Sequence, residues 1–138
     1  MDSVMKCEIV SMEHRLFTGE ATFVSVPALP GAMGFYPKHS PVIAPLGSGI
    51  IKIVNGNEAE PIQYVVRGGY VENDGVRVTI LADYAENMAD LTVDGLKQKI
   101  AGIEEKLAAI EEGYTSRIRL TTQDLEWNKR LLSIVESQ

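Results

Sequence analysis

The hydrophobic pattern of this chain changes its period close to Asp90. Before Asp90, residues 5–9 and 76–80 alternate apolar and polar side chains, the period that places successive side chains on opposite faces of a strand. After Asp90, apolar residues recur at steps of four and three, which draws one stripe along a helix. The residues of this stripe are Leu96, Ile100, Ile103, Leu107 and Ile110. The pattern therefore predicts an α+β protein that is mostly β, with residues 1–87 forming an antiparallel β-sandwich or flattened barrel and residues 88–138 forming an α-helical hairpin.

Short strands and turn signals fill the first half of the chain. Further runs rich in β-formers occupy residues 22–27, 49–54 and 62–66. The turn signals between the runs are Thr18-Gly19, Asn55-Gly56-Asn57, Gly68-Gly69 and Asn73-Asp74-Gly75. Asn-Gly and Asp-Gly favour hairpins because both central residues of a type I′ turn need a positive φ. The Gly68-Gly69 pair predicts either a close approach of two backbones or a β-bulge.

The second half predicts two antiparallel helices. Thr92 is the expected N-cap of the first helix, with Asp94 in its first turn, and Gly113 is expected to end it as the C′ residue. A second helix is expected from about Ser116. Its apolar residues are Ile118, Leu125 and Leu132 at heptad spacing, with Leu120, Trp127, Leu131 and Ile134 widening the face. Two helices joined at one glycine form an antiparallel hairpin.

Glycine and proline concentrate in one apolar segment. Five of the six prolines and four of the twelve glycines lie between residues 27 and 49. Proline fixes φ and removes a hydrogen-bond donor, so this segment cannot be helical. It is also too apolar for a disordered linker, with large side chains at Met33, Phe35, Tyr36, Val42, Ile43 and Leu46. We expect a rigid, partly buried loop-and-strand segment whose shape forms a docking surface.

Composition excludes several classes of protein. A net charge of −6 argues against a nucleic-acid-binding protein, because phosphate contacts need a basic face. No apolar run approaches the roughly 20 residues of a membrane span. The acidic Asp2 and the absence of an uninterrupted apolar run after it argue against a signal peptide. The single Cys7 excludes an intramolecular disulfide. The expectation is a soluble cytoplasmic protein.

The residue pattern offers little catalytic chemistry. His14 and His39 have no acid or cysteine at the spacing of a catalytic or metal-binding motif, and His14 beside Glu13 is a common surface pair. Cys7 lies in an alternating strand, which favours a small buried side chain over a nucleophile. The glycines form neither a Walker nor a dinucleotide-binding fingerprint. We expect no catalytic residues, no metal site and no cofactor.

The helical hairpin allows two interpretations. Its apolar stripes can pack against each other and against the sandwich, or a helical appendage can leave the sandwich and enter a partner groove. The second helix also carries a group of basic residues, Arg117, Arg119, Lys129 and Arg130. These residues either form a solvated face or favour an acidic partner surface.

The segment Gly31-Ala-Met-Gly-Phe-Tyr-Pro-Lys-His-Ser-Pro-Val42 closely resembles the G-x-(L/M)-G-(I/F)-x-P-x-H-x-P-(L/V) signature of the ATP synthase epsilon subunit family. Other blocks match in order: Val10-Ser with Leu16-Phe-x-Gly19, Tyr64-x-x-x-Gly-Gly-x-Val-Glu72, and Val76-x-Val-Thr-Ile-Leu-Ala-Asp83 before the helices. The resemblance covers essentially the whole chain.

The resemblance implies a fold and a function that periodicity alone does not. Family members have a β-sandwich of about ten strands followed by a helical hairpin. They are non-catalytic subunits of the rotor's central stalk in a proton- or sodium-driven ATP synthase, and they couple rotation of the membrane c-ring to the catalytic head. The sandwich docks on the gamma subunit and the polar loops of the c-ring. The hairpin either folds against the sandwich or extends into the alpha/beta head and inhibits ATP hydrolysis, a bistable element.

The implied location is the cytoplasmic face of the cell membrane, as a peripheral part of the complex without insertion into lipid. The family's c-ring-facing loop corresponds to Gly31, Ala32, Met33, Gly34, His39 and Pro41. Some members have an acid at the position of Ala32, so here shape rather than charge is expected to make the contact. Arg117, Arg119 and Arg130 lie where family hairpins carry basic residues that face acidic groups of the catalytic subunits.

Some bacterial members bind ATP on the hairpin through an I-D-x-x-R-A motif. In the register that keeps Arg119, Ser116 stands at the acid and Leu120 at the alanine, so we expect weak or absent ATP binding, with Arg119 and Arg130 as the remaining candidates. The alternative function is a free-standing nucleotide or anion sensor in which Arg117, Arg119 and Arg130 converge in the folded hairpin. A hydrolase using His39 would need a partner carboxylate or nucleophile that the sequence does not display.

Overall fold

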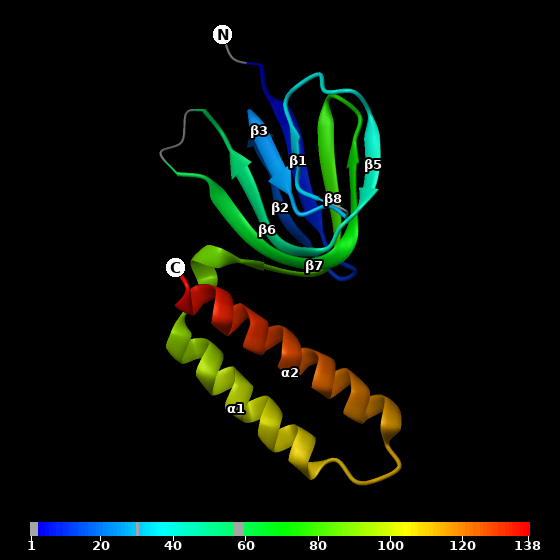
Figure 1. The fold of residues 1–138 in the computed structure, drawn as a ribbon, viewed down its shortest axis with the longest axis vertical. Helices are drawn as coiled ribbons and strands as arrows, with labels where there is room; N and C mark the ends of the chain where they lie inside the picture. Colours follow the sequence, from blue (N-terminus) through cyan, green and yellow to red (C-terminus); the bar gives the residue numbers. More distant parts are fainter. Residues whose placement is uncertain (1–2, 30, 57–59) are drawn as a thin grey trace. The chain divides into compact units, whose positions relative to one another are not determined.

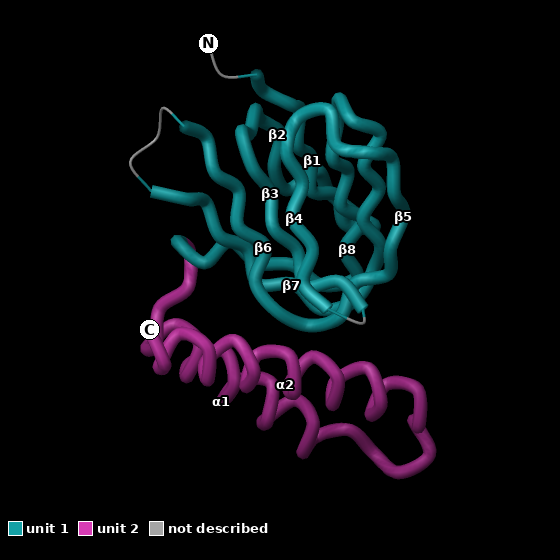
Figure 2. Tube along the Cα trace, turned by 45° about the horizontal axis from the view of Figure 1, so that its top comes forward, with its two compact units in different colours: residues 1–89 teal, residues 90–138 magenta. Residues whose placement is uncertain are grey.

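The computed structural model describes residues 3–29, 31–56 and 60–138, and the chain divides into two compact units, Met1–Ala89 and Asp90–Gln138. Figure 2 colours the two units, and Figure 1 labels their elements. Unit 1 contains β1 (Met5–Val10), β2 (Arg15–Ala21), β3 (Phe23–Val26), β4 (Met33–Phe35), β5 (Val42–Pro45), β6 (Ser48–Val54), β7 (Ile62–Asn73) and β8 (Arg77–Asn87). A 3₁₀ turn, η1 (Met88–Asp90), leads to α1 (Val93–Ala109) and α2 (Thr115–Glu136).

The strands of unit 1 form a β-sandwich, as the sequence predicts. The described strands form one eight-stranded sheet in the order β2-β1-β8-β7-β6-β3-β4, with β5 pairing β7. The described strand pairs are antiparallel, as predicted, except that β1 pairs β8 in parallel. The rest of the sandwich separates these two strands in the chain and supplies the long connection that parallel pairing needs. The family resemblance also implied about ten strands, two more than the described residues contain.

The Gly68-Gly69 pair bends β7 from one layer of the sandwich to the other, the strand that curves beneath the others in Figure 1. Before the pair, β7 pairs with β6, and after it β7 pairs with β5. Both glycines have a positive φ, 74° and 118°. A Cβ on Gly69 would lie 1.9 Å from the Leu81 carbonyl oxygen, so the predicted close backbone approach is confirmed. The expectation that the strand ends here is wrong, because the ladder with β8 resumes at Gly69.

The other predicted turns have different outcomes. Asn73-Asp74-Gly75 does connect β7 to β8, but the positive φ lies at Gly75 alone (93°), so the connection is not a type I′ turn. The predicted Thr18-Gly19 turn is wrong, since both residues lie inside β2. At Gly19 the Phe17 ring lies close to the backbone, since a Cβ at this position would lie 2.8 Å from it. In the Asn55-Gly56-Asn57 turn, Asn57 is outside the described residues.

Asp74 stabilises the β7–β8 turn through its carboxylate. The backbone N–H groups of Val76 and Arg77 donate to its Oδ1 at 2.9 and 2.8 Å. These hydrogen bonds lower the pKa of the Asp74 carboxyl below its ordinary value, because they favour the charged form.

The core of unit 1 lies between the two layers. Its fully buried residues include Met5, Cys7, Ile9, Val24, Phe35, Ile51, Val66, Val71, Val78 and Ile80. Cys7 is a buried side chain, as the alternation of β1 predicts, and burial raises the pKa of its thiol to about 12. A thiol held neutral in this way is a poor nucleophile.

The two helices of unit 2 form an antiparallel hairpin (Figure 1). Thr92 caps α1 as predicted, with its hydroxyl accepting from the Gly95 N–H at 3.1 Å. The prediction that Gly113 ends the helix is wrong, because α1 ends at Ala109 and Gly113 lies in the turn with φ 99°. The interface between the helices contains Ile100, Ile103 and Leu125, flanked by Leu107 and Leu132. Within the described residues, neither helix is long and apolar enough to cross a membrane.

Candidate functional surfaces

The glycine- and proline-rich segment contains β4 and β5, so its rigidity comes from the sandwich itself. Gly31 and Ala32 are exposed and lead into β4, where Met33 and Gly34 are half-buried and pair with β3. A Cβ on Gly34 would lie 2.7 Å from the Phe23 ring, so a side chain there would require the ring to shift. The exposed backbone at Gly31 is different, because a Cβ there would meet nothing within 4 Å.

The structure places residues 28–29 and the turn around Lys38 at opposite ends of β5. At one end, Ala28 bridges to Leu46 and the Leu29 N–H donates to the Pro45 carbonyl at 2.9 Å, next to Gly31 and Ala32. At the other end, the Lys38 N–H donates to the Gly75 carbonyl at 2.8 Å. The six residues that the sequence assigned to one ring-facing loop therefore form two surfaces, with His39 and Pro41 away from Gly31 and Ala32.

We call residues 36–40 the histidine turn. The His39 N–H donates to the Tyr36 carbonyl at 3.0 Å, and Lys38 has a positive φ of 68°. The His39 ring lies edge-on to Phe35, with centroids 5.5 Å apart, and its Nδ1 is 2.8 Å from the Ser40 carbonyl oxygen. In the tautomer with a proton on Nδ1, the ring donates to that oxygen. The His39 ring is thus held in place by Ser40 of its own turn and by Phe35.

Asn73 is the residue at this surface that sequence reasoning missed. It is 1% exposed, and its side-chain amide hydrogen-bonds the histidine turn and the β7–β8 turn. The sequence gives a weak signal for it, because Asn73 occupies the inward register of β7 two residues after the buried Val71. The Asn-Asp-Gly motif, however, is equally typical of a turn in which the asparagine makes no contact with another segment.

An exposed apolar row crosses the outer face of the sandwich. Strand pairing aligns Pro45 of β5 with Tyr70 of β7, Tyr70 with Leu81 of β8, and Leu81 with Val10 of β1. Tyr70 and Leu81 are 58% and 51% exposed, and the nearby Ile43 is 69% exposed. Sequence reasoning missed this row as well. Its signal is the adjacent pair Ile80 and Leu81, since two successive apolar residues in a strand point to opposite faces.

The basic residues of the hairpin do not converge. Arg117, Arg119, Lys129 and Arg130 are all exposed along α2. At a rise of about 1.5 Å per residue, Arg117 and Arg130 are separated by about 20 Å along the helix axis. The arrangement required of a sensor, with Arg117, Arg119 and Arg130 around one ligand, is therefore absent from the folded hairpin.

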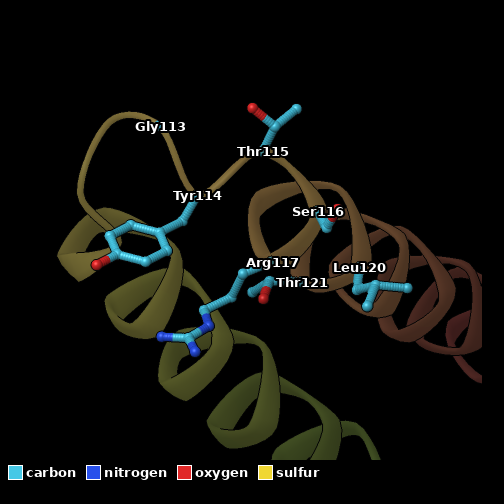
Figure 3. Close-up of a pocket in the computed structure, with 7 residues that line it drawn as sticks. All are labelled: Gly113, Tyr114, Thr115, Ser116, Arg117, Leu120 and Thr121. Carbon is cyan, nitrogen blue, oxygen red and sulfur yellow. The ribbon is translucent and has the colours of Figure 1, made fainter.

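A shallow hollow lies at the turn of the hairpin (Figure 3). It has a volume of about 530 Å³ and is lined by Gly113, Tyr114, Thr115, Ser116, Arg117, Leu120 and Thr121. The Arg117 guanidinium lies 5.4 Å from the centroid of the Tyr114 ring, a cation–π distance. Arg119 and Arg130, the remaining candidates for nucleotide binding, do not line it. Among the described residues, no group of three or more His, Cys, Asp or Glu side chains gathers closely enough to hold a metal ion.

Comparison with protein families identifies the sandwich. Residues 4–88 match the family of the ATP synthase delta/epsilon chain β-sandwich domain. The chain belongs to the ATP synthase delta/epsilon family. The resemblance in the glycine- and proline-rich segment is thereby confirmed, and so is the sandwich fold that it implies.

Curated relatives of this family are named ATP synthase epsilon chain. One from Neisseria meningitidis serogroup C is 36% identical over 89 residues, and one from Herminiimonas arsenicoxydans is 40% identical over 91 residues. These matches cover 64% of the first relative and 65% of the second, so the chain matches slightly less than two thirds of their lengths. A match of this length fits unit 1 and is too short to span the hairpin as well.

Solved structures extend the likeness of fold beyond the matched sequence. A chain of the Euglena gracilis mitochondrial ATP synthase, solved as an OSCP/F1/c-ring assembly, has a TM-score of 0.59 at 17% identity and covers 86% of this chain and 74% of its own. A chain of the Tetrahymena thermophila mitochondrial ATP synthase central stalk and c-ring has a TM-score of 0.51 at 12% identity. The match covers 88% of this chain and 96% of the Tetrahymena chain. At these identities the likeness concerns the fold alone.

Proposed function

We propose that this protein is a non-catalytic central-stalk subunit of a rotary ATP synthase, coupling rotation of a c-ring to the catalytic head. The observation that carries the proposal is the family match over residues 4–88, in a unit that exposes an apolar row on its strands. The curated relatives are named for the same subunit, and the two structural neighbours come from assemblies that include the c-ring.

The apolar row supports docking on a gamma-type subunit. Tyr70, Leu81 and Ile43 offer apolar area on rigid strands, and exposed apolar patches of this kind mark protein–protein interfaces. Aromatic and aliphatic side chains held by a sheet lose little conformational entropy on binding, which favours a stable interface. The neighbouring Glu8 and Arg77, joined at 3.4 Å, supply a polar border.

The separation of the two ends of the loop sharpens the assignment of partners. We assign Gly31 and Ala32 to the c-ring, because both are exposed and Gly31 has no side chain to keep a polar loop from its backbone. Met33 and Gly34 hold that end in β4. We assign His39 and Pro41 to the gamma side, because the histidine turn adjoins the first residues of β5, next to Ile43.

The hairpin is proposed to inhibit ATP hydrolysis when it reaches the catalytic subunits. Arg117, Arg119, Lys129 and Arg130 are exposed and suit the acidic partner surface that the resemblance implies. The protein is then a peripheral component at the cytoplasmic face of the membrane, with ion coupling by protons or sodium supplied by the rest of the complex.

Reconstitution tests both halves of the proposal. The full chain, added to an ATP synthase stripped of its epsilon subunit, is expected to be retained with gamma and the c-ring and to lower the ATPase rate. A chain truncated after Met88 is expected to be retained but to leave hydrolysis uninhibited. Failure of the full chain to be retained would overturn the stalk assignment, and equal inhibition by both chains would overturn the role of the hairpin.

A pair of surface variants tests the apolar row. Leu81→Glu places a charge in the middle of the row and is expected to weaken retention by gamma at least tenfold, since desolvating a carboxylate in an apolar interface is costly. Met12→Glu is the matched control, because Met12 is 97% exposed in the β1–β2 connection, outside the row. Equal retention of the two variants would remove the row from the interface.

A further inference from the structure

Asn73 joins two turns that are far apart in the sequence. Its Nδ2 group donates to the carbonyls of His39 at 3.4 Å and Ser40 at 3.2 Å, and its Oδ1 accepts from the Gly75 N–H at 3.2 Å. We propose that Asn73 is the positioning residue of the histidine turn and fixes the shape in which this turn meets the stalk. This inference rests on the proposed function for the partner, and on the structure alone for the positioning.

The chemistry of the contact requires an amide. An asparagine side chain carries two N–H donors and an acceptor oxygen, so it can serve carbonyls on one side and an N–H on the other. Asn73 is 1% exposed, and water therefore cannot replace a missing partner without reorganisation of the turn. Aspartate keeps the acceptor and loses the donors, and alanine loses both.

Backbone contacts make the same connection beside the amide. The Lys38 N–H donates to the Gly75 carbonyl at 2.8 Å. Gly75 also comes close to the turn, since a Cβ at this position would lie 3.2 Å from the His39 carbonyl oxygen. Lys38 adopts a positive φ of 68°, a conformation that costs a lysine free energy and persists only where the surroundings hold it. Asn73 and Gly75 are those surroundings.

The position of the turn indicates the surface that it serves. Asn73 pairs with Val42, the first residue of β5, and the next residue, Ile43, is 69% exposed beside the apolar row. Tyr36 in the turn and Val76 in the β7–β8 connection are also exposed apolar side chains, at 62% and 70%. The turn thus continues the surface assigned to the gamma side, and its shape sets the end of that interface.

Amide hydrogen exchange on the full chain tests the positioning. Asn73→Ala and Asn73→Asp are expected to speed exchange of the Lys38 and His39 amides by about tenfold, the effect of losing a buried hydrogen bond. The His39 ring resonances, set by the Phe35 ring beside them, are expected to shift toward random-coil values. The control is Val78→Ala, a buried position opposite Asn73 in the ladder whose side chain makes no hydrogen bond. Unchanged exchange at Lys38 and His39 in both Asn73 variants would overturn the inference.

Binding of the same proteins to a synthase stripped of epsilon tests the consequence. Both Asn73 variants are expected to need about tenfold more protein for half-saturation, whereas Val78→Ala binds as the wild type once its folded fraction is taken into account. Faster amide exchange with unaltered binding would show that the conformation of the histidine turn does not affect binding to the stalk. That result would overturn the docking half of the inference. A wild-type chain that fails to bind would refute the proposed function, while the exchange data would still decide the positioning.

Discussion

The two units of this protein differ in how closely their glycines are packed. In the sandwich, Gly69 lies against the Leu81 carbonyl, and Gly68 and Gly75 adopt positive φ, so single positions allow only glycine without strain. In α1, a Cβ on Gly102 would meet nothing within 4 Å. The family match covers residues 4–88 and stops before the helices. That family is defined by the β-sandwich domain, so the contrast between the units rests on their geometry: backbone clearance restricts the sandwich, whereas the hairpin depends on an apolar stripe.

The largest effect is expected from one substitution made in both units. Gly69→Ala is expected to destabilise the sandwich by about 4 kcal/mol or more, since the new methyl group overlaps a backbone carbonyl that cannot move aside. Gly102→Ala, in the interior of α1, is expected to stabilise the hairpin by about 0.5–1 kcal/mol through helix propensity. Urea unfolding measures both values.

The chain offers separate probes for the two transitions. Its single tryptophan, Trp127, lies in α2 and reports the hairpin, and the circular dichroism of the strands reports the sandwich. Equal stability changes in the Gly69→Ala and Gly102→Ala variants would contradict the claim that backbone packing restricts the sandwich more than the hairpin.

Packing between the helices gives the next largest effect. Leu125→Ala is expected to cost the hairpin about 3 kcal/mol, because Leu125 is buried against Ile100 and Ile103 and its removal leaves a cavity. Leu120→Ala is the matched control, with Leu120 59% exposed on the same helix and an expected change below about 0.5 kcal/mol. A similar loss in both variants, followed by Trp127 fluorescence, would mean that the stripe does not hold the hairpin together.

The ionisation of Cys7 is expected to lower the stability of the sandwich as the pH rises above 9. Its pKa is raised from 9.0 to about 12 in the folded protein, so the thiol is neutral in both states below pH 9. Above pH 9 the unfolded chain ionises first, and stability is expected to fall by about 1.4 kcal/mol per pH unit up to pH 12 from this group. The loss is measured as the difference from Cys7→Ala, which keeps every other titrating group. Parallel pH profiles of the two proteins would contradict the assignment.

The smallest loss of stability is expected at the helix cap. Thr92→Ala is expected to cost the hairpin about 1 kcal/mol, since it removes the acceptor for the Gly95 N–H. Thr92→Ser retains a hydroxyl and is expected to restore most of that stability. The same fluorescence titration follows both variants, and indistinguishable midpoints for alanine and wild type would exclude the cap as a source of stability.

Local chemistry explains which features the sequence predicted. The alternation in β1 and the stripe in α1 each bury one face, so residues such as Cys7 and Ile100 could be assigned from spacing. Thr92 could be assigned because a cap needs only its own first turn. Gly113 was assigned wrongly, because its positive φ serves the turn rather than the end of α1, and glycine chemistry is the same in both places.

The candidate surfaces depended on pairings that no local signal contains. The apolar row exists because β5, β7, β8 and β1 align Pro45, Tyr70, Leu81 and Val10, which are distant in the chain. Asn73 reaches His39 across 34 positions for the same reason. The division of the glycine- and proline-rich segment into two surfaces likewise follows from the direction of β5.

The sequence by itself determined the two kinds of unit, the family signature and the close backbone approach at Gly69, because periodicity and backbone sterics act over a few residues. Tertiary structure alone decided that β1 runs parallel to β8 and that Asn73 holds the histidine turn. Those features depend on which distant segments meet, and strand register is settled by the packing of the whole sandwich.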